Sequence, residues 1–193
     1  MRGGDKGAGW LGGYHLRRVI GRGGSGVVWE AEDDGGNRVA LKLLHPSLAA
    51  TEGARLRLLR EARLVNQVRS PHVVRVLDVE ADASAPFVVT ELVDGPTLDA
   101  EISRLTYRAA DAAQLGTELA GALDAIHATG TAHRDVKPSN VVLTRRGPVL
   151  IDFGIAQGGD DEHLTMTGAI AGTPGYVSPE LLAHPDAPSL TML

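Results

Sequence analysis

Apolar and polar residues alternate along most of the first half of the chain, a pattern typical of half-buried β-strands. Breaks rich in glycine and aspartate separate the alternating runs and favour turns. Residues 52–69 instead carry a helical spacing, with Leu58, Ala62 and Val65 at i, i+4 and i+7, and Pro71 should end that helix. We therefore predict one helix and five strands, the strands covering residues 14–20, 27–32, 38–44, 73–79 and 87–93.

The second half of the chain has mainly helical periodicity. An apolar stripe runs through residues 109–128, and Gly130 follows it as a C-terminal cap. The stripe consists of Leu115, Leu119, Ala122, Leu123 and Ile126. Two short apolar runs, 141–143 and 149–151, predict a small hairpin. Five strands with one helix, followed by a mainly helical part, predict an α+β protein in two lobes.

The composition is that of a globular protein, since 43% of the 193 residues are hydrophobic and 22% are charged. This length allows one domain with a sizeable core or two small lobes. The chain has no cysteine, which excludes disulfides and cysteine-ligated metals. No run approaches eighteen apolar residues and the N-terminus lacks the apolar core of a signal peptide. We therefore expect no membrane segment and a cytoplasmic location.

The charges argue against one class of partner. The net charge is −5, and no part of the sequence resembles the basic footprint of a nucleic-acid binder. We therefore expect no nucleic-acid partner.

Three glycines, Gly21, Gly23 and Gly26, stand where two predicted strands meet. Glycine lets a backbone approach a ligand closely. The same spacing occurs in dinucleotide-binding turns, but those need a helix after the loop, and residues 27–29 continue as strand. The spacing alone leaves open a phosphate-binding loop and a glycine-rich hairpin turn that binds nothing.

Lys42 is one of only three lysines in the chain, and it shares one side of a predicted strand with Ala40. A single lysine on a strand is usually a solvated surface residue. Glu61, however, lies on the apolar face of the predicted helix 52–69, where a carboxylate needs a partner. We therefore predict that Lys42 pairs with Glu61.

The segment with the most specific chemistry reads His133-Arg-Asp-Val-Lys-Pro-Ser-Asn140, and Asp152-Phe-Gly154 follows it. Asn140 and Asp152 offer the oxygen ligands that suit a hard cation such as Mg²⁺ carried on phosphates. Asp135 can accept a hydroxyl proton, and Lys137 can neutralise charge on a transferring phosphoryl group. Each residue alone could form a turn or carry a surface charge, but their order and spacing together favour the chemical interpretation.

From about Leu11 to Glu180 these motifs resemble the eukaryotic-like serine/threonine protein kinases of bacteria, especially those of actinobacteria. The resemblance implies the two-lobe protein-kinase fold, with a five-stranded antiparallel N-lobe that carries one main helix and an incomplete, mainly helical C-lobe. It implies ATP and Mg²⁺ as cofactors and proteins as substrates. It also allows a homodimer formed through the N-lobe, which no residue here specifies.

The same resemblance divides the chain and assigns a role to individual residues. The expected parts are a flexible N-terminus (1–12), an N-lobe (13–93), a partial C-lobe with the catalytic loop and the activation segment (94–180), and an irregular tail (181–193). The expected catalytic residues are Asp135 as the base, Lys137, Asn140 and Thr173, and the expected Mg²⁺ ligands are Asn140 and Asp152. The residues assigned to the nucleotide site are Ile20, Gly21, Gly23, Gly26, Val28, Ala40, Lys42, Glu61, Thr90, Glu91, Val93 and Val142.

The resemblance also describes the nucleotide pocket. Val28 and Ala40 would lie above the adenine and Val142 below it. Thr90 falls at the gatekeeper position, where a small side chain leaves a deeper back pocket. We therefore expect bulky inhibitors of the ATP site to bind this protein.

Two positions are typical of serine/threonine rather than tyrosine kinases: Lys137 after the catalytic aspartate, and Thr173 before Tyr176. Arg134 implies control by phosphorylation of the activation segment, at Thr165 or Thr167.

Arg57 allows two interpretations. It could join Arg134 in binding such a phosphate. Alternatively, it and the other arginines of residues 52–69 form a solvated helix face.

A complete kinase would continue after Glu180 with a long central helix. Residues 181–193 instead hold two closely spaced prolines and no hydrophobic stripe. We therefore expect the domain to stop before its last third and to expose part of the apolar stripe at 109–128. Two functions stay open: an ATP-dependent protein kinase, or a truncated, non-catalytic nucleotide-binding or interaction module.

Overall fold

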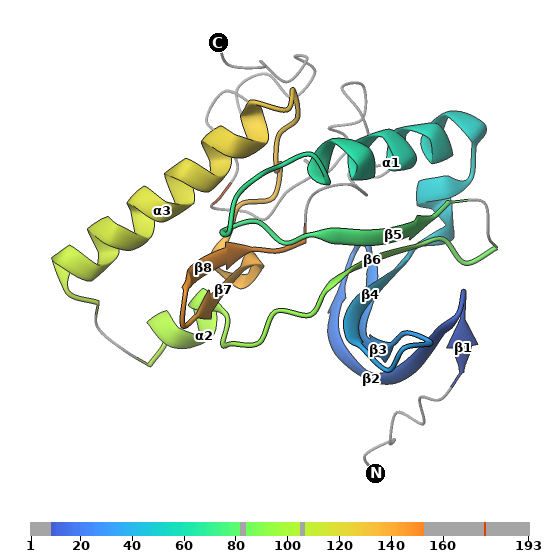
Figure 1. Ribbon diagram of the computed structural model, residues 1–193, viewed down its shortest axis with the longest axis horizontal. Coiled ribbons are helices and arrows are strands. Elements are labelled where there is room, and N and C mark those ends of the chain that lie inside the picture. The colour runs from blue at the N-terminus through green and yellow to red at the C-terminus, as the bar shows by residue number, and fades with distance from the viewer. Residues whose placement is uncertain (1–8, 82–83, 105–106, 153–175, 177–193) are drawn as a thin grey trace. The chain divides into compact units, whose positions relative to one another are not determined.

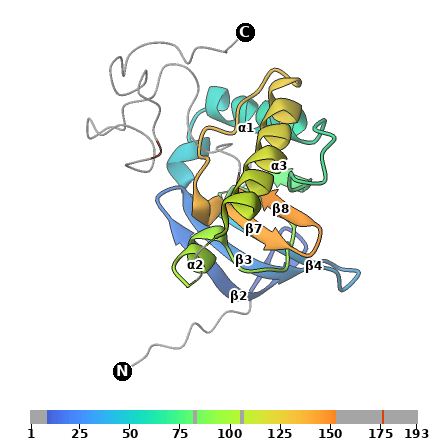
Figure 2. The same cartoon turned by 90° about the vertical axis from the view of Figure 1, so that its left-hand side faces the viewer.

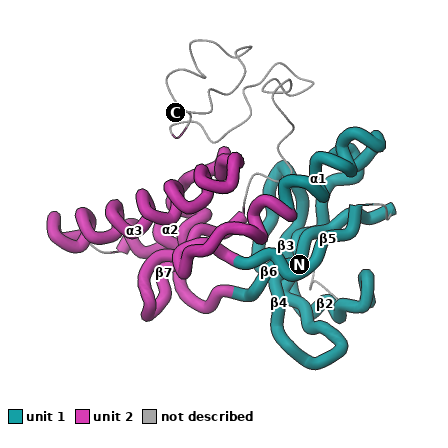
Figure 3. Tube along the Cα trace, turned by 45° about the horizontal axis from the view of Figure 1, so that its top comes forward, with its two compact units in different colours: residues 1–62, 75–92 teal, residues 63–74, 93–193 magenta. Residues whose placement is uncertain are grey.

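A computed structural model describes residues 9–81, 84–104, 107–152 and 176 of the chain (Figure 1). The contacts within the chain separate two compact units (Figure 3). Unit 1 comprises Met1–Ala62 and Arg75–Leu92, and unit 2 comprises Arg63–Val74 and Val93–Leu193.

Unit 1 is built on an antiparallel sheet that contains all five predicted strands and one more. Its order is β1-β2-β3-β4-β6-β5. The strands are β1 (Trp10–Leu11), β2 (Tyr14–Gly23), β3 (Gly26–Glu32), β4 (Arg38–Leu44), β5 (Val76–Glu80) and β6 (Phe87–Glu91). The two-residue strand β1 was not predicted, because two residues are too few to show an alternating pattern. It pairs with the first two residues of β2.

The predicted helix is present as α1, Glu52–Val65, but it ends before the proline that was expected to stop it. A turn follows, in which the amide of Gln67 donates to the carbonyl of Leu64 (3.0 Å). The next strand begins later than predicted, at Val76. Residues 73–74 pair instead with Leu150 in unit 2, through an isolated bridge at Val73 and a 3.0 Å bond from the amide of Val74. The short 3₁₀-helix η1, Pro46–Ala49, was not predicted.

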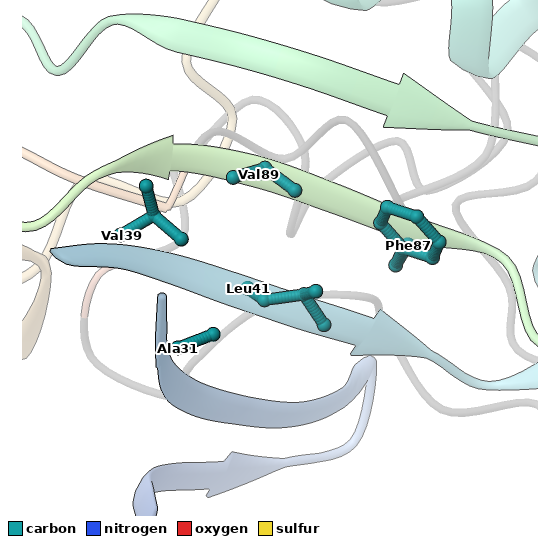
Figure 4. Packing of buried hydrophobic residues seen from close by; sticks show 5 residues of the cluster. All are labelled: Ala31, Val39, Leu41, Phe87 and Val89. Carbon is teal, nitrogen blue, oxygen red and sulfur yellow. The ribbon is translucent and has the colours of Figure 1, made fainter. Parts of the chain in front are cut away.

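The core of unit 1 lies on one face of the sheet. Five buried side chains from β3, β4 and β6 meet there: Ala31, Val39, Leu41, Phe87 and Val89 (Figure 4). Burying a side chain as large as that of leucine or phenylalanine contributes about 1.5–3 kcal/mol. Because strand side chains alternate, Ala40 and Lys42 on β4 point to the opposite face. Because the core occupies one face of the sheet, the face that carries Ala40 and Lys42 is the one available for other contacts.

Unit 2 contains the helices α2 (Leu98–Ile102) and α3 (Ala109–His127), the 3₁₀-helix η2 (Pro138–Asn140), and the strands β7 (Val141–Thr144) and β8 (Gly147–Leu150). The last two form the predicted hairpin, and α3 contacts β8 (Figure 2). Helix α3 confirms the predicted helix at 109–128 to within one residue. The short helix α2 was not predicted.

The apolar stripe of α3 is buried only toward its C-terminal end. Ala122 and Ile126 are fully buried, whereas Leu115 and Leu119 are half-buried. Among the described residues, no helix combines the length and the apolar character needed to cross a membrane.

Candidate active site

Three of the predicted catalytic residues of unit 2 are in contact with one another. The amide nitrogen Nδ2 of Asn140 donates to Oδ2 of Asp135 (2.9 Å) and also to the main-chain carbonyl of Asp135 (2.8 Å). The ammonium of Lys137 lies 2.7 Å from the same carboxylate oxygen. Both hydrogen-bonding partners are largely buried, since Asn140 is 6% exposed and the Asp135 side chain is 10% exposed. Two donors therefore bind one oxygen of Asp135 in a place that water reaches poorly.

The hydrogen bonds of Asn140 also restrict what else its side chain can do. Because Nδ2 donates to Asp135, Oδ1 is the atom of this amide that can accept a bond or bind a cation. Its main chain is fixed as well, since its amide donates to the carbonyl of Lys137 (2.9 Å) and its carbonyl accepts from the amide of Ile151 (2.9 Å). The second of these bonds ties the loop to the residue before Asp152.

Two residues of this region have left-handed backbone conformations although they are not glycine. Arg134 has φ of 63° and Asp152 has φ of 56°. This region is unfavourable for residues with a side chain, and such residues persist where surrounding contacts hold them. Both flank the contacts just described, next to Asp135 and next to Ile151. The local strain thus coincides with the predicted site.

His133 holds the two ends of this region together, and its role was not predicted from the sequence. It is 1% exposed, and its Nε2 donates to the carbonyl of Ile151 (3.2 Å). Burial lowers the pKa of His133, because an imidazolium would lose its hydration, and its hydrogen bond to Ile151 and the charges of nearby aspartates only partly offset this. The imidazole is therefore neutral at pH 7. No periodicity in the sequence marked this histidine as buried, since it lies outside any regular helix or strand.

The donors available for a metal are few. No group of three or more histidine, cysteine, aspartate or glutamate side chains that could hold a metal lies within the described part of the chain. The predicted Mg²⁺ ligands, Asn140 and Asp152, supply one amide oxygen and one carboxylate. Such a set suits an ion that is bound largely by water and phosphate oxygens rather than by a protein cage.

In unit 1, the register of the sheet brings four predicted residues of the nucleotide site onto one face. Lys42 lies directly opposite Val28 on β3, and Ala40 lies opposite Thr90 on β6. Residues opposite one another in an antiparallel pair point to the same side. Val28, Ala40, Lys42 and Thr90 therefore share the face that is turned away from the apolar core.

The three glycines lie on the β2–β3 hairpin, and the structure gives them different surroundings. A Cβ at Gly26, where φ is 147°, would lie 2.0 Å from the carbonyl oxygen of Leu43. A Cβ at Gly21 would be in ordinary contact with Val28, at 3.6 Å. A Cβ at Gly23 would meet nothing within 4 Å. Packing against β4 thus accounts for Gly26, whereas no contact within the described residues requires glycine at position 23.

The remaining residues that were predicted for the nucleotide site are distributed over both units. In unit 1, Ile20 is an exposed apolar residue at a bulge of β2, and Glu61 is half-buried on α1. Glu91 ends β6, and its Oε1 accepts from the amide of Arg75 (3.0 Å). In unit 2, Val93 is half-buried and Val142 is buried on β7.

Several predicted residues lie outside the described ranges. They are Thr173 of the catalytic set, the predicted phosphorylation sites Thr165 and Thr167, and residues 153–154 after Asp152.

A family model described as "Protein kinase domain" matches residues 14–190 of the chain, ten residues beyond the end of the resemblance stated above. The serine/threonine-protein kinases PknH and PknD of Mycobacterium tuberculosis (strain ATCC 25618 / H37Rv) are 40% and 41% identical to it over 177 and 173 residues. The serine/threonine-protein kinase AfsK of Streptomyces coelicolor is 37% identical over 171 residues. These matches cover 90%, 88% and 88% of this chain but only 28%, 26% and 21% of the relatives. The chain thus spans less than a third of the length of these curated relatives.

Solved structures of kinase domains also match this chain. Two crystal structures of the M. tuberculosis PknI kinase domain match with TM-scores of 0.69 and 0.68, at 29% and 32% identity. The matches cover 85% and 84% of this chain and 68% of each crystallised chain.

Proposed function

This chain belongs to the protein kinase domain family, and from that premise we propose that it transfers the γ-phosphoryl group of ATP to serine or threonine hydroxyls of proteins in bacterial signalling. The observation that carries the proposal is the contact among Asp135, Lys137 and Asn140. The relatives named above are serine/threonine-protein kinases, which supports serine and threonine hydroxyls as the acceptors.

The roles of the catalytic-loop residues follow from their hydrogen bonds. Asp135 accepts the proton of the substrate hydroxyl at Oδ1, because two donors already bind Oδ2. Lys137, next to this carboxylate, neutralises charge on the phosphoryl group as it moves. Asn140 holds Asp135 in place through Nδ2, and its Oδ1 would be available to bind the metal. Lys137 and Asn140 thereby position the base and the phosphoryl group relative to one another.

The cofactors ATP and Mg²⁺ belong to this proposal. Asn140 and Asp152 would hold Mg²⁺, which when bound neutralises phosphate charge. On the sheet face of unit 1, Val28 and Ala40 would contact the adenine and Lys42 the phosphates, with Glu61 as the partner of Lys42. The family resemblance also assigns Val142, which is buried on β7, to the adenine.

The glycine hairpin completes the proposed nucleotide site. Gly23 supports this, because no described residue lies within 4 Å of where its Cβ would be, which leaves room on that side for a ligand to approach the main chain. Gly21 and the exposed Ile20 lie on the same hairpin.

Further parts of the proposal concern location and partners. They are a cytoplasmic location, protein substrates, and a homodimer through the N-lobe. Control through a phosphate at Thr165 or Thr167 remains a prediction as well, since neither residue lies in the described ranges.

The proposal is tested with the purified chain, γ-labelled ATP, Mg²⁺ and a generic protein substrate such as casein. The matched control is Asp135→Asn, which keeps the shape of the side chain but removes the base. We expect transfer of label by the unmodified chain and a loss of about 10²–10⁴-fold in the variant. Acid hydrolysis of the product should release phosphoserine or phosphothreonine.

Equal labelling by the chain and by Asp135→Asn would contradict a catalytic role for this polypeptide. Binding of Mg²⁺-ATP, seen as an increase in melting temperature, together with no transfer would instead support the non-catalytic alternative.

A further inference from the structure

One hydrogen bond in unit 1 joins strands that are not neighbours. The sheet order places β3, β4 and β6 between β2 and β5. Nevertheless, the phenol of Tyr14, the first residue of β2, donates to Oδ2 of Asp78 on β5 at 3.0 Å. Such a contact requires a strongly curled sheet, and the bend of β2 and β3 is visible in Figure 1. We call this contact between Tyr14 and Asp78 the clasp.

The ring of Tyr14 is held as well as its hydroxyl. It meets the ring of Phe87 edge to face, with centroids 6.0 Å apart and an interplanar angle of 77°. The chain before Tyr14 passes close to the same ring, because a Cβ at Gly12 would lie 2.3 Å from its Cζ. The first residue of β2 is therefore located by three independent features: a close approach, a ring contact and a hydrogen bond.

The clasp also affects the titration of the phenol. Partial burial raises the pKa of Tyr14 to about 12, and the hydrogen bond to Asp78 adds to this effect. The hydroxyl therefore stays protonated, and able to donate, throughout the physiological range.

Among the described residues, the outer side of β2 is paired only at its start. Strand β1 pairs with Tyr14 and His15, and the amide of Leu16 donates to the carbonyl of Gly9 (3.1 Å). The pairing of β2 with β3 is interrupted twice, between Leu16 and Arg18 and between Val19 and Gly21. Bulges of this kind bend and twist a strand. The part of β2 that leads into the glycine turn therefore depends on how its two ends are held.

The far end of the hairpin has its own attachment. The carbonyl of Ser25 accepts from the amide of His45 (3.1 Å), and Gly26 packs on the carbonyl of Leu43. The clasp at Tyr14 thus forms the second of two anchors, and the bulges and Gly21 lie between them.

We infer that Tyr14 is a positioning residue for the nucleotide. Its hydrogen bond to Asp78 fixes the start of β2 and thereby holds Ile20 and Gly21 at the distance from the sheet face that nucleotide binding needs. The inference rests on the proposed function, since it assumes that the nucleotide lies against this face. Neither residue of the clasp is among those assigned to the nucleotide site. Loss of the clasp allows the β2–β3 hairpin to adopt more positions, of which only some can bind the nucleotide. The apparent affinity then falls in proportion to the fraction of molecules whose hairpin is in a binding position.

The experiment measures binding of ADP by calorimetry to the full chain and its variants. Tyr14→Phe removes the hydroxyl and keeps the ring contact with Phe87. Asp78→Ala removes the acceptor. Asp78→Asn keeps an amide oxygen that can accept from the phenol, and is the conservative variant that should restore binding. Tyr107→Phe, in unit 2, is the matched control for the loss of a phenolic hydroxyl.

We expect Tyr14→Phe and Asp78→Ala each to weaken ADP binding about threefold to tenfold, the scale of one hydrogen bond. The double variant should be no weaker than either single one, because both remove the same contact. Asp78→Asn and Tyr107→Phe should stay within about twofold of the unmodified chain, a margin well below one hydrogen bond. Affinities for Tyr14→Phe and Asp78→Ala that equal that of Tyr107→Phe would overturn the inference.

Amide hydrogen exchange without nucleotide keeps this result separate from the proposed function. If the unmodified chain binds no ADP, the proposed function fails. The rate of amide hydrogen exchange at residues 16–23 then still tests whether the clasp restrains the hairpin. Faster exchange there in Tyr14→Phe than in Tyr107→Phe supports the inference, and equal exchange overturns it.

Discussion

The catalytic loop of unit 2 and the sheet face of unit 1 carry their predicted site residues in different ways. In the loop, Asp135, Lys137 and Asn140 lie within a few positions of one another, and contacts of 2.7–2.9 Å join their side chains. On the sheet, Val28, Ala40 and Thr90 come from three strands, and the strand register alone places them on one face. The loop is thus held by local polar contacts, and the face by long-range pairing.

This difference predicts different consequences of substitution. A change in the loop should disturb the chemistry directly, because buried hydrogen bonds hold the base. A change in the sheet or its hairpin should act on stability or on nucleotide affinity, because the backbone there provides the surface.

Asn140→Ala should reduce phosphoryl transfer by about 10²–10³-fold, the scale of removing one preorganised donor at a reacting centre. The carboxylate of Asp135 would lose the bond from Nδ2, while the sheet face of unit 1 stays intact. Steady-state kinetics should therefore show the loss mainly in kcat. Asn66→Ala, at an exposed asparagine, is the control. A loss seen mainly in the KM for ATP would contradict the contrast between loop and sheet.

Gly26→Ala should lower the free energy of unfolding by about 3 kcal/mol or more, because the new Cβ would clash with the carbonyl of Leu43 and the backbone is left-handed. Gly23→Ala is the matched variant and should change stability by less than about 1 kcal/mol, since its Cβ would meet no described residue within 4 Å. Urea unfolding measures both. Gly23→Ala should still weaken nucleotide binding if the ligand approaches the main chain at this residue. Equal stability of the Gly26→Ala and Gly23→Ala variants would contradict the close packing of Gly26 against Leu43.

The buried His133 should make the stability of the chain depend on pH. Its pKa is lowered in the folded state, whereas in the unfolded chain it titrates near its ordinary value of about 6.5. Below that pH the unfolded state binds more protons, so stability falls as the pH decreases, by at most about 1.4 kcal/mol per pH unit from this group. His133→Gln should reduce this slope in urea unfolding between pH 7 and pH 5. His127→Gln, at an exposed histidine, should not; an identical slope in both variants would mean that His133 is not the group responsible.

The smallest effect is expected at Thr90. Thr90→Met should weaken a bulky inhibitor of the ATP site about tenfold, because the longer side chain fills space beside Ala40 on the sheet face. ADP, which does not need the back pocket, should bind within about threefold of its original affinity. Competition binding measures both ligands. An unchanged inhibitor affinity would count against the gatekeeper assignment.

The sequence predicted the elements better than their ends. Strands and helices with clear periodicity, such as the strands of unit 1 and α3, were located to within a few residues. The end of α1 was predicted too late, because Pro71 suggested a stop, whereas the helix ends at Val65. The strand after it was predicted to begin too early, because residues 73–74 pair with Leu150 instead of with the sheet. That pairing partner lies far along the chain, so no local pattern indicates it. The short elements β1 and α2 have too few residues to show a period.

For the candidate site, the residue types of the catalytic loop were readable because their chemistry and spacing are local. The sequence by itself thus predicted candidates for the base, the metal ligands and the phosphate contact, and it determined that Lys42 and Ala40 share a strand face. It did not determine that Asn140 uses its nitrogen on Asp135, that His133 is buried, or that Gly26 differs from Gly23.

Those features, and the clasp between Tyr14 and Asp78, were decided by the tertiary structure alone. The physical reason is the same for each of them. A hydrogen bond, a buried imidazole or a close approach to a carbonyl depends on atoms that the register and the curl of the chain bring together. Local alternation specifies the face on which a side chain lies, but not the neighbour that it meets there.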